Sequence, residues 1–288
     1  MKARAVIVAL VFSAAAALPS CNASKRVRPD APRPRIVSFS PALTQILFDM
    51  GLGDHVVGVT RWCILPVGEQ REIVGDREIV STEAILNVEP DIVVIQQSDE
   101  KFNALRAVDP RIQIEQFEIE TLRHVAMAIE RLGGLAGDFE LGIERRRAFE
   151  ADLKAVADGV AGKPRPRVLF LIGYDRPLAC GKGTFVDDMI TLAGGANAAA
   201  ERYDLYANVS NEVVIDLAPQ VLICQVDVGQ QDLARAHWNS LKDLPAVKSK
   251  RVHVIIDRRW TIPSTLSAMF AAELAEMIHP PPEGGAGR

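Results

Sequence analysis

The chain is poor in the features that mark several functional classes. Aromatic residues make up only 6% of its 288 residues, and the formal net charge is −4, without the basic face expected of a nucleic-acid binder. No Cys-x-x-Cys pair occurs among the four cysteines, which argues against a structural zinc site. The five histidines are scattered, so none has metal-ligand spacing to another. We therefore expect no resident metal ion and no nucleic-acid partner.

Motifs of catalysis and nucleotide binding are missing as well. No Gly-x-Gly-x-x-Gly follows a strand pattern, and neither Gly-x-Ser-x-Gly nor His-Glu-x-x-His occurs. The segment Gly181–Thr184 resembles part of a phosphate-binding loop, but Lys182 is not followed by serine or threonine. With no catalytic constellation in the sequence, we expect a protein that is not an enzyme.

Long apolar runs are confined to the amino terminus. A positively charged start precedes the apolar stretch 5–18, which is too short to span a bilayer comfortably. No later run reaches 18 apolar residues. This pattern predicts a signal peptide over residues 1–20.

The residues after this stretch suggest a lipid anchor. Leu18-Pro19-Ser20-Cys21 resembles a bacterial lipobox, in which Cys21 becomes lipidated, although proline is unusual at its position. Ordinary signal cleavage after Ala23 is the alternative. The chain is then either anchored to a membrane on the periplasmic or cell-surface side, or soluble in the periplasm. Residues 21–34, rich in proline and basic residues, are expected to form a tether.

Strand and helix patterns alternate from residue 35 onward, which is typical of parallel α/β structure. Serine and threonine before several helices suit N-caps, and glycines suit helix ends, including Gly133-Gly134 after one helix. The expected strands are 36–39, 56–59, 91–95, 111–117, 168–172, 221–224 and 252–256. The expected helices are 41–50, 81–88, 121–132, 184–193, 210–217 and 266–278.

One longer helix interrupts this alternation. Residues 138–161 contain no proline, and their apolar residues from Phe149 to Val160 follow a 4-3-4 spacing. A helix of this length extends about 36 Å, which suits a rigid connection between two lobes.

An internal repeat supports the two-lobed arrangement. Residues 80–96 read VSTEAILNVEPDIVVIQ and residues 209–225 read VSNEVVIDLAPQVLICQ, aligned without a gap at an offset of 129. Such a match indicates duplication of a structural unit. The identical pairs are Val80/Val209, Ser81/Ser210, Glu83/Glu212, Pro90/Pro219 and Gln96/Gln225.

The sequence thus predicts an α/β fold with two similar lobes, each with a mainly parallel sheet flanked by helices, joined by one long α-helix. The amino-terminal lobe is expected at 35–137, the linking helix at 138–161 and the carboxyl-terminal lobe at 165–280. Residues 281–288 are expected to form a tail.

Three segments together carry a family resemblance. The opening 34–60 has a strand, a Ser-Pro-capped helix and a Gly-x-Gly-Asp turn, and Glu83–Ile95 and Gly181–Asn197 match further motifs. The chain therefore resembles the helical-backbone class (class III) of periplasmic binding proteins. Members of this class deliver cobalamin, iron siderophores, haem or bare metal ions to ABC importers. The resemblance covers residues 34 to about 280.

Partners and ligand follow from this resemblance as expectations. It implies a monomer that binds a metal chelate (a corrinoid, a ferric siderophore or haem) between its lobes and delivers it to an ABC permease dimer with its ATPase. The scattered histidines argue against the branch that binds bare metal ions. Alternatives are a ligand-sensing receptor for a signalling partner, or an enzyme acting on a chelate through Asp175 and Cys180.

Glu83 and Glu212 are the candidate docking residues. In cobalamin- and siderophore-binding relatives, one such glutamate on each lobe meets arginines of the two permease subunits. The structural alternative is that each carboxylate only stabilises the positive end of its helix, worth about 0.3–1 kcal/mol.

The ligand cleft is expected at the carboxyl ends of the strands. Flat aromatic side chains there suit a macrocycle or a catecholate, although tryptophan also packs in cores and Cys63 also suits a buried thiol. The candidate ligand-binding residues are Ser40, Arg61, Trp62, Cys63, Gln96, Gln97, Tyr174, Arg176, Tyr203, Tyr206, Gln225, Arg259 and Trp260.

Overall fold

The structure is a computed structural model, and it describes residues 33–281. The predicted signal peptide, the predicted lipidation site Cys21, all but two residues of the predicted tether and all but the first residue of the predicted tail lie outside the described residues.

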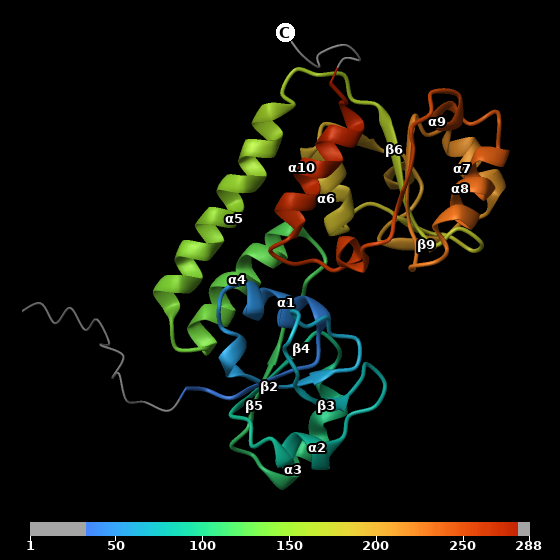
Figure 1. Ribbon diagram of the computed structural model, residues 1–288. Helices are drawn as coiled ribbons and strands as arrows, with labels where there is room; N and C mark the ends of the chain where they lie inside the picture. The colour runs from blue at the N-terminus through green and yellow to red at the C-terminus, as the bar shows by residue number, and fades with distance from the viewer. Residues whose placement is uncertain (1–32, 282–288) are drawn as a thin grey trace, which may run out of the picture. The chain divides into compact units, whose positions relative to one another are not determined.

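The first half of the described chain forms a five-stranded sheet, sheet A, in which every pairing is parallel. Its strand order is β3-β2-β1-β4-β5 (Figure 1). Because the strands are parallel, all five carboxyl ends lie at one edge of the sheet. The strands are β1 (Ile36–Ser38), β2 (Val56–Thr60), β3 (Glu72–Gly75), β4 (Ile92–Ile95) and β5 (Gln113–Gln116).

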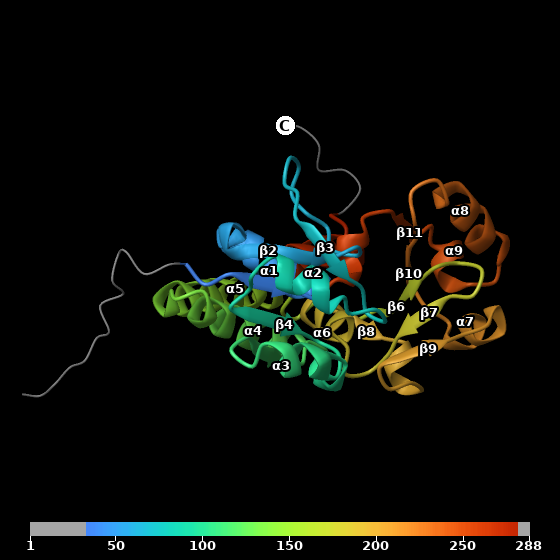
Figure 2. The same cartoon turned by 90° about the horizontal axis from the view of Figure 1, so that it is seen from below.

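The second half forms sheet B, which is mixed. Strands β11, β10 and β6 are parallel neighbours, whereas β7 runs antiparallel to β6 and β9 antiparallel to β7. Figure 2 shows β6, β7 and β9 side by side at this end of the sheet. The strands are β6 (Arg167–Ile172), β7 (Leu178–Cys180), β8 (Ala196–Asn197), β9 (Tyr206–Asn208), β10 (Val221–Gln225) and β11 (Val252–Ile255).

Helices connect and cover both sheets. Those predicted from capping residues begin where expected, because each N-cap hydroxyl accepts a hydrogen bond from a first-turn backbone N–H. The helices are α1 (Pro41–Asp49), α2 (Thr82–Asn87), α3 (Asn103–Val108), α4 (Leu122–Leu135), α5 (Phe139–Gly159), α6 (Phe185–Leu192), α7 (Asn211–Leu217), α8 (Gln231–Ser240), α9 (Pro245–Lys248) and α10 (Ser267–Ile278). Short 3-10 helices are η1 (Gly53–His55), η2 (Asp99–Phe102), η3 (Ala199–Glu201) and η4 (Arg258–Thr261).

The two faces of each sheet belong to different apolar clusters. Along β6, Val168 and Phe170 join a cluster with α6 and α10, whereas Leu169 and Leu171 join a second cluster with α7, α8 and α9. Successive side chains of a strand point to opposite faces, so an unbroken apolar run is needed when both faces are covered. The first cluster also takes in α1, α4 and Phe149 of α5, so one apolar core passes through both lobes.

The expected fold class is confirmed, and the duplication extends beyond the repeated segment. In each sheet the first strand, β1 or β6, pairs with the strand that follows α2 or α7, and the last strand lies beyond that one. The helix after each last strand, α4 or α10, packs against α5 (Figure 1). The long linking helix therefore packs against one equivalent helix from each lobe.

The predicted end of helix 121–132 at Gly133-Gly134 is wrong. Both glycines lie inside α4, and the chain leaves the helix only before Gly137, which has a φ of +87°. Gly133 faces α5, where a Cβ atom would lie 2.5 Å from the Cα of Gly142. Gly133 therefore permits a close helix crossing, and neither glycine ends the helix.

Two polar contacts tie the lobes together beside this shared core. The N–H of Leu122, at the start of α4, donates to the Asp188 carboxylate on α6 over 2.9 Å. Burial raises the pKa of Asp188, and this hydrogen bond only partly opposes it. Thr265, just before α10, donates its hydroxyl hydrogen to Asp49 at the end of α1.

Candidate functional site

A pocket of about 340 Å³ lies at the carboxyl edge of sheet A. The segments that follow all five strands contribute to its lining, as expected for a binding site in an open parallel sheet. Three candidate residues, Trp62, Gln96 and Gln97, come together there. The lining residues are Phe39, Pro41, Thr60, Trp62, Arg77, Gln96, Gln97 and Glu120.

Polar side chains are packed next to this pocket. Ser40 is almost fully buried, accepts the N–H of Leu43 as the cap of α1, and donates its hydroxyl hydrogen to Gln96. Cys63 is half-buried, and its sulfur lies 3.2 Å from the Thr44 hydroxyl oxygen. Ser40 and Cys63 are not among the lining residues, so they support the wall of the pocket.

Two lining groups are available for a ligand. The Trp62 side chain is 53% exposed although it is large and apolar. The Nε2 atom of Gln97 is buried and has no hydrogen-bond partner among the described residues. A buried amide donor left unpaired costs free energy, so a ligand acceptor at this point would be favourable.

The charges around the pocket nearly balance. Arg61 forms an ion pair with Asp76 at 3.1 Å, and backbone N–H groups of Ile79 and Glu78, with Arg61, hold the pKa of Asp76 below its usual range. Of the lining residues, Arg77 carries a positive charge and Glu120 a negative one. The pocket is therefore polar without a strong net charge.

Several candidates of the second lobe pack in its interior. Trp260 is 3% exposed, and its ring stacks on Phe270 at 4.7 Å between centroids. Gln225 is 5% exposed and donates to the backbone oxygen of Val226. We correct the expectation that these two line a cleft, because their side chains are enclosed by the core. Tyr174 and Tyr203 are half-buried against the cluster that covers the other face of sheet B.

The remaining candidates of the second lobe lie apart from one another. Arg176 is exposed and lines a hollow of about 720 Å³ beside Ser210. The Arg259 side chain donates three hydrogen bonds to Asp257, two residues before it. Tyr206 is 39% exposed on β9. Its partial burial raises the pKa of the phenol, and the neighbouring Cys180 and Glu120 raise it further.

Both candidate docking glutamates are exposed at the second position of their short helices. Glu83 follows the N-cap Ser81 of α2, and Glu212 follows the N-cap Ser210 of α7. The Ser210 hydroxyl and the glutamate's own backbone N–H hold the pKa of Glu212 below its usual range.

Five lining residues were not predicted from the sequence: Phe39, Pro41, Thr60, Arg77 and Glu120. Arg77 follows β3, a strand that the sequence did not reveal, and Glu120 follows the weakly patterned β5. The sequence did indicate the positions of Phe39 and Thr60, because they lie at or directly after the ends of predicted strands.

A larger hollow, of about 820 Å³, lies along α4 and the start of α5. None of the candidate ligand-binding residues lines it, and only one strand end contributes. We therefore place the candidate site in the smaller pocket at the strand ends.

The cysteines and acidic residues form no metal site in the part of the chain that the structure describes. No group of three or more histidine, cysteine, aspartate or glutamate side chains within residues 33–281 is arranged to hold an ion. Burial raises the pKa of the Cys180 thiol to about 12 and that of the Cys224 thiol to about 11, so neither is a ready nucleophile. Among the described helices, none combines the length and apolar character needed to cross a membrane.

Comparison with known proteins identifies the class. Two lobes that each carry a sheet, joined by one long helix, with a polar pocket at strand ends, describe a two-lobed binding protein. The family model described as periplasmic binding protein matches residues 36–258. The chain belongs to the periplasmic binding protein family.

Individual relatives share only about a quarter of their residues with this chain. A cobalamin-binding protein of Halobacterium salinarum is 28% identical over 206 residues, covering 69% of this chain and 55% of the relative, so the chain spans about half of that protein. An uncharacterized ABC transporter substrate-binding lipoprotein of Bacillus subtilis, YvrC, is 26% identical over 85% of this chain and 80% of its own length. The structure of the periplasmic heme-binding protein RhuT from Roseiflexus, in its apo form, superposes with a TM-score of 0.73 at 26% identity, covering 86% of this chain and 98% of RhuT.

Proposed function

We propose that this chain is the substrate-binding protein of an ABC importer and that it binds a metal chelate, foremost a corrinoid, at the carboxyl edge of sheet A. The observation that carries this proposal is the pocket to which all five strand ends contribute, with an exposed Trp62 and an unpaired Gln97 amide. An aromatic face suits a flat macrocycle, and an amide donor suits carbonyl groups at its periphery.

The charge balance favours a corrinoid over an anionic chelate. Haem and ferric siderophores carry carboxylates or catecholates, which are best bound by several free arginines. Here Arg61 is paired with Asp76, and Arg77 is offset by Glu120 in the pocket lining. The cobalamin-binding relative points to the same ligand. Haem is the second candidate, supported by the likeness to RhuT.

Visible absorption spectroscopy tests this choice. Purified protein is incubated with cyanocobalamin, haemin or a ferric siderophore mixture and then separated from free ligand. We expect retention of the corrinoid spectrum. Retention of haemin alone would assign the pocket to the second candidate, and retention of none would contradict the proposal for a chelate.

Replacement of Trp62 by alanine should weaken binding of the retained ligand. We expect an affinity loss of about thirtyfold, equivalent to ~2 kcal/mol, because a large aromatic contact at the centre of a site often has that value. The matched control is Phe139→Ala: Phe139 is 55% exposed, close to the 53% of Trp62, but lies outside the pocket. Equal affinities of the Trp62→Ala protein and this control, measured by equilibrium titration, would contradict the placement of the site.

Docking to the permease completes the proposed function. We propose that Glu83 and Glu212 each meet one subunit of the permease dimer, which works with its ATPase. Both are exposed, occupy the same helical position and recur 129 residues apart in the sequence. Two equivalent charges on the carrier suit two equivalent permease surfaces.

A lipid anchor at Cys21 is also a proposal, because this residue lies outside the described part of the chain. The lipobox-like sequence and the lipoprotein YvrC support it. Replacing Cys21 by alanine should move most of the protein from the membrane fraction to the soluble periplasmic fraction, because the anchoring acyl chains are lost. Quantitative immunoblotting of both fractions, with ligand binding as a control for folding, measures this. A wild-type protein already found wholly in the soluble fraction contradicts the anchor.

A further inference from the structure

A short sequence precedes the first strand of each lobe and is the same in both. Pro-Arg-Pro-Arg occurs at 32–35, directly before β1, and again at 164–167, running into β6. Its second arginine is Arg35 in the first lobe and Arg167 in the second.

Arg35 binds the carboxyl-terminal end of α2. Its Nε atom donates to the backbone oxygen of Glu89 over 2.9 Å, and its Nη2 atom to that of Val88 over 2.8 Å. Its own backbone N–H donates to the Asp91 carboxylate over 2.7 Å. One residue thus connects the start of the first strand to the end of the glutamate-bearing helix.

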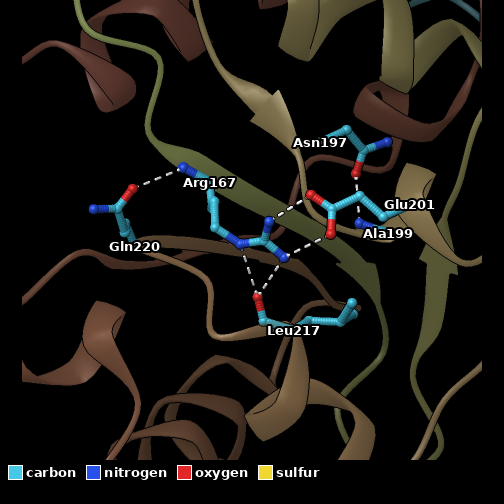
Figure 3. A network of polar contacts seen from close by, with 6 residues as sticks. All are labelled: Arg167, Asn197, Ala199, Glu201, Leu217 and Gln220. Carbon is cyan, nitrogen blue, oxygen red and sulfur yellow. Dashed lines mark hydrogen bonds and ion pairs between the residues drawn. The ribbon is translucent and has the colours of Figure 1, made fainter.

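Arg167 makes the equivalent contacts with α7, as Figure 3 shows. Its Nε and Nη2 atoms donate to the backbone oxygen of Leu217 over 3.1 and 2.9 Å. Its backbone N–H donates to the Gln220 side chain over 2.9 Å. A bidentate contact with Glu201 on η3 holds the guanidinium from its other side.

The groups bound by the two arginines are equivalent in the repeat. Val88 and Leu217 are 129 residues apart, as are Asp91 and Gln220. A left-handed residue that is not glycine follows each helix, with φ of 42° at Glu89, two residues beyond α2, and 46° at Ala218, directly after α7. Carbonyl groups at a helix end lack partners within the helix and carry partial negative charge, so a guanidinium is a suitable partner for them.

We propose that Arg35 and Arg167 are positioning residues for the permease interface, each fixing the helix that presents Glu83 or Glu212. This inference rests on the proposed docking role of those glutamates. Helices α2 and α7 have only six and seven residues, too few to be stable by themselves, so their direction depends on contacts with the sheet. Because each arginine donates to a carbonyl at the end of its helix, both glutamate-bearing helices are tied to the first strand of their lobe.

The test compares Arg35→Gln and Arg167→Gln with matched controls. Arg33→Gln and Arg165→Gln change the first arginine of each Pro-Arg-Pro-Arg segment, which contacts Asp54 or the backbone oxygen of Gly195 and neither glutamate-bearing helix. Glu201→Gln removes the ion pair of Arg167 but leaves its contact with Leu217. Arg35 is exposed and the Arg167 side chain is 34% exposed, so the two arginine variants should fold.

Hydrogen exchange of the full-length protein reports on helix positioning without any partner. We expect amides of α2 to exchange about tenfold faster in Arg35→Gln, which corresponds to ~1.4 kcal/mol, and those of α7 to do so in Arg167→Gln. The control variants should match the wild type in these helices. Ligand affinity, measured with the chelate that the spectra identify, should not change.

Affinity for the purified permease–ATPase complex of the same organism, reconstituted in nanodiscs, completes the test. Each arginine variant should bind about tenfold more weakly than the wild type. In the Glu212→Gln background, Arg167→Gln should add little, because the charge that it positions is already gone, whereas in the Glu83→Gln background its effect should remain complete. A general loss of stability would instead be additive in both backgrounds.

The outcomes separate the inference from the function on which it rests. If the glutamate variants weaken permease binding but the arginine variants do not, the positioning role is overturned and docking stands. Full additivity within one lobe, or exchange rates equal to those of the controls, also overturns it. If the glutamate variants themselves bind like the wild type, the docking proposal fails, and the positioning role fails with it.

Discussion

A Gly133→Ala protein is expected to lose about 3 kcal/mol of unfolding free energy. A Cβ atom at Gly133 would lie 2.5 Å from the Cα and 2.7 Å from the nitrogen of Gly142, and 2.9 Å from the oxygen of Asp138. All three are backbone atoms, so the close crossing of α4 and α5 has to open. Overpacking of this kind costs about 1–3 kcal/mol in a side-chain core, and a backbone obstacle places it at the upper end.

The next residue provides the control with the opposite sign. At Gly134 a Cβ atom would meet only the Phe139 ring, at an ordinary 3.5 Å. Alanine is favoured over glycine inside a helix by about 1 kcal/mol, so Gly134→Ala should be neutral or stabilising. Urea unfolding of both variants measures the difference. Shifts of similar size and the same sign would show that the crossing does not depend on Gly133.

The combined Glu83→Gln and Glu212→Gln protein is expected to bind the permease complex about a hundredfold more weakly, equivalent to ~2.7 kcal/mol, with unchanged affinity for its ligand. Each single variant should lose about tenfold, because each lobe would contribute one ion-paired contact. The ligand affinity should hold because neither glutamate lines the pocket at the strand ends. Higher ionic strength should narrow the gap between wild type and variant, since salt screens exposed charges.

Glu140→Gln is the control for a helix-end effect. Glu140 also occupies the second position of a helix, α5, and is exposed, so its replacement removes the same interaction with the helix dipole. It should leave permease binding intact. If ligand affinity falls in the double variant while permease affinity holds, the glutamates belong to ligand recognition and the docking assignment is wrong.

Much of the fold could be predicted because its local signals agree with its packing. Ser40, Ser81, Thr121, Thr184 and Ser210 each precede an apolar periodic segment, and each caps the helix that follows. Elements that are stabilised mainly by tertiary contacts have weaker secondary-structure patterns in the sequence. Strand β3 reads Glu-Ile-Val-Gly with two exposed residues, and α8 has only two fully buried side chains. Gly133 misled the prediction because a helix end and a close helix crossing select the same residue.

The candidate site was predictable in the first lobe and much less so in the second. Sheet A follows the rule for parallel strands, so the residues after β2 and β4 reach one pocket. In sheet B the strand equivalent to β2 is reduced to the two residues of β8, and β7 runs antiparallel along the end of β6. Loops that reach the pocket in the first lobe therefore have no direct counterpart in the second. The sequence does not reveal this reversal, because β7 is only three residues long.

The repeated Pro-Arg-Pro-Arg segment was visible in the sequence but lay outside the aligned repeat. Its offset is 132 residues, whereas that of residues 80–96 is 129, so a single ungapped comparison misses it. A search that allowed a gap of three residues would have joined the two matches. The role of the arginines could not have followed even then, because their carbonyl partners come from residues about 50 positions away.

Each sheet is formed by one uninterrupted stretch of chain, residues 36–116 for sheet A and 167–255 for sheet B. A chain that emerges amino terminus first can therefore complete sheet A and the pair of helices α4 and α5 before Arg167 becomes available. The side of α4 that contacts α6 stays uncovered during that interval, as does the side of α5 that contacts α10. Slow synthesis prolongs this exposure of apolar surface, so the interval between completion of the first lobe and of the second is a time when the new chain is prone to aggregate.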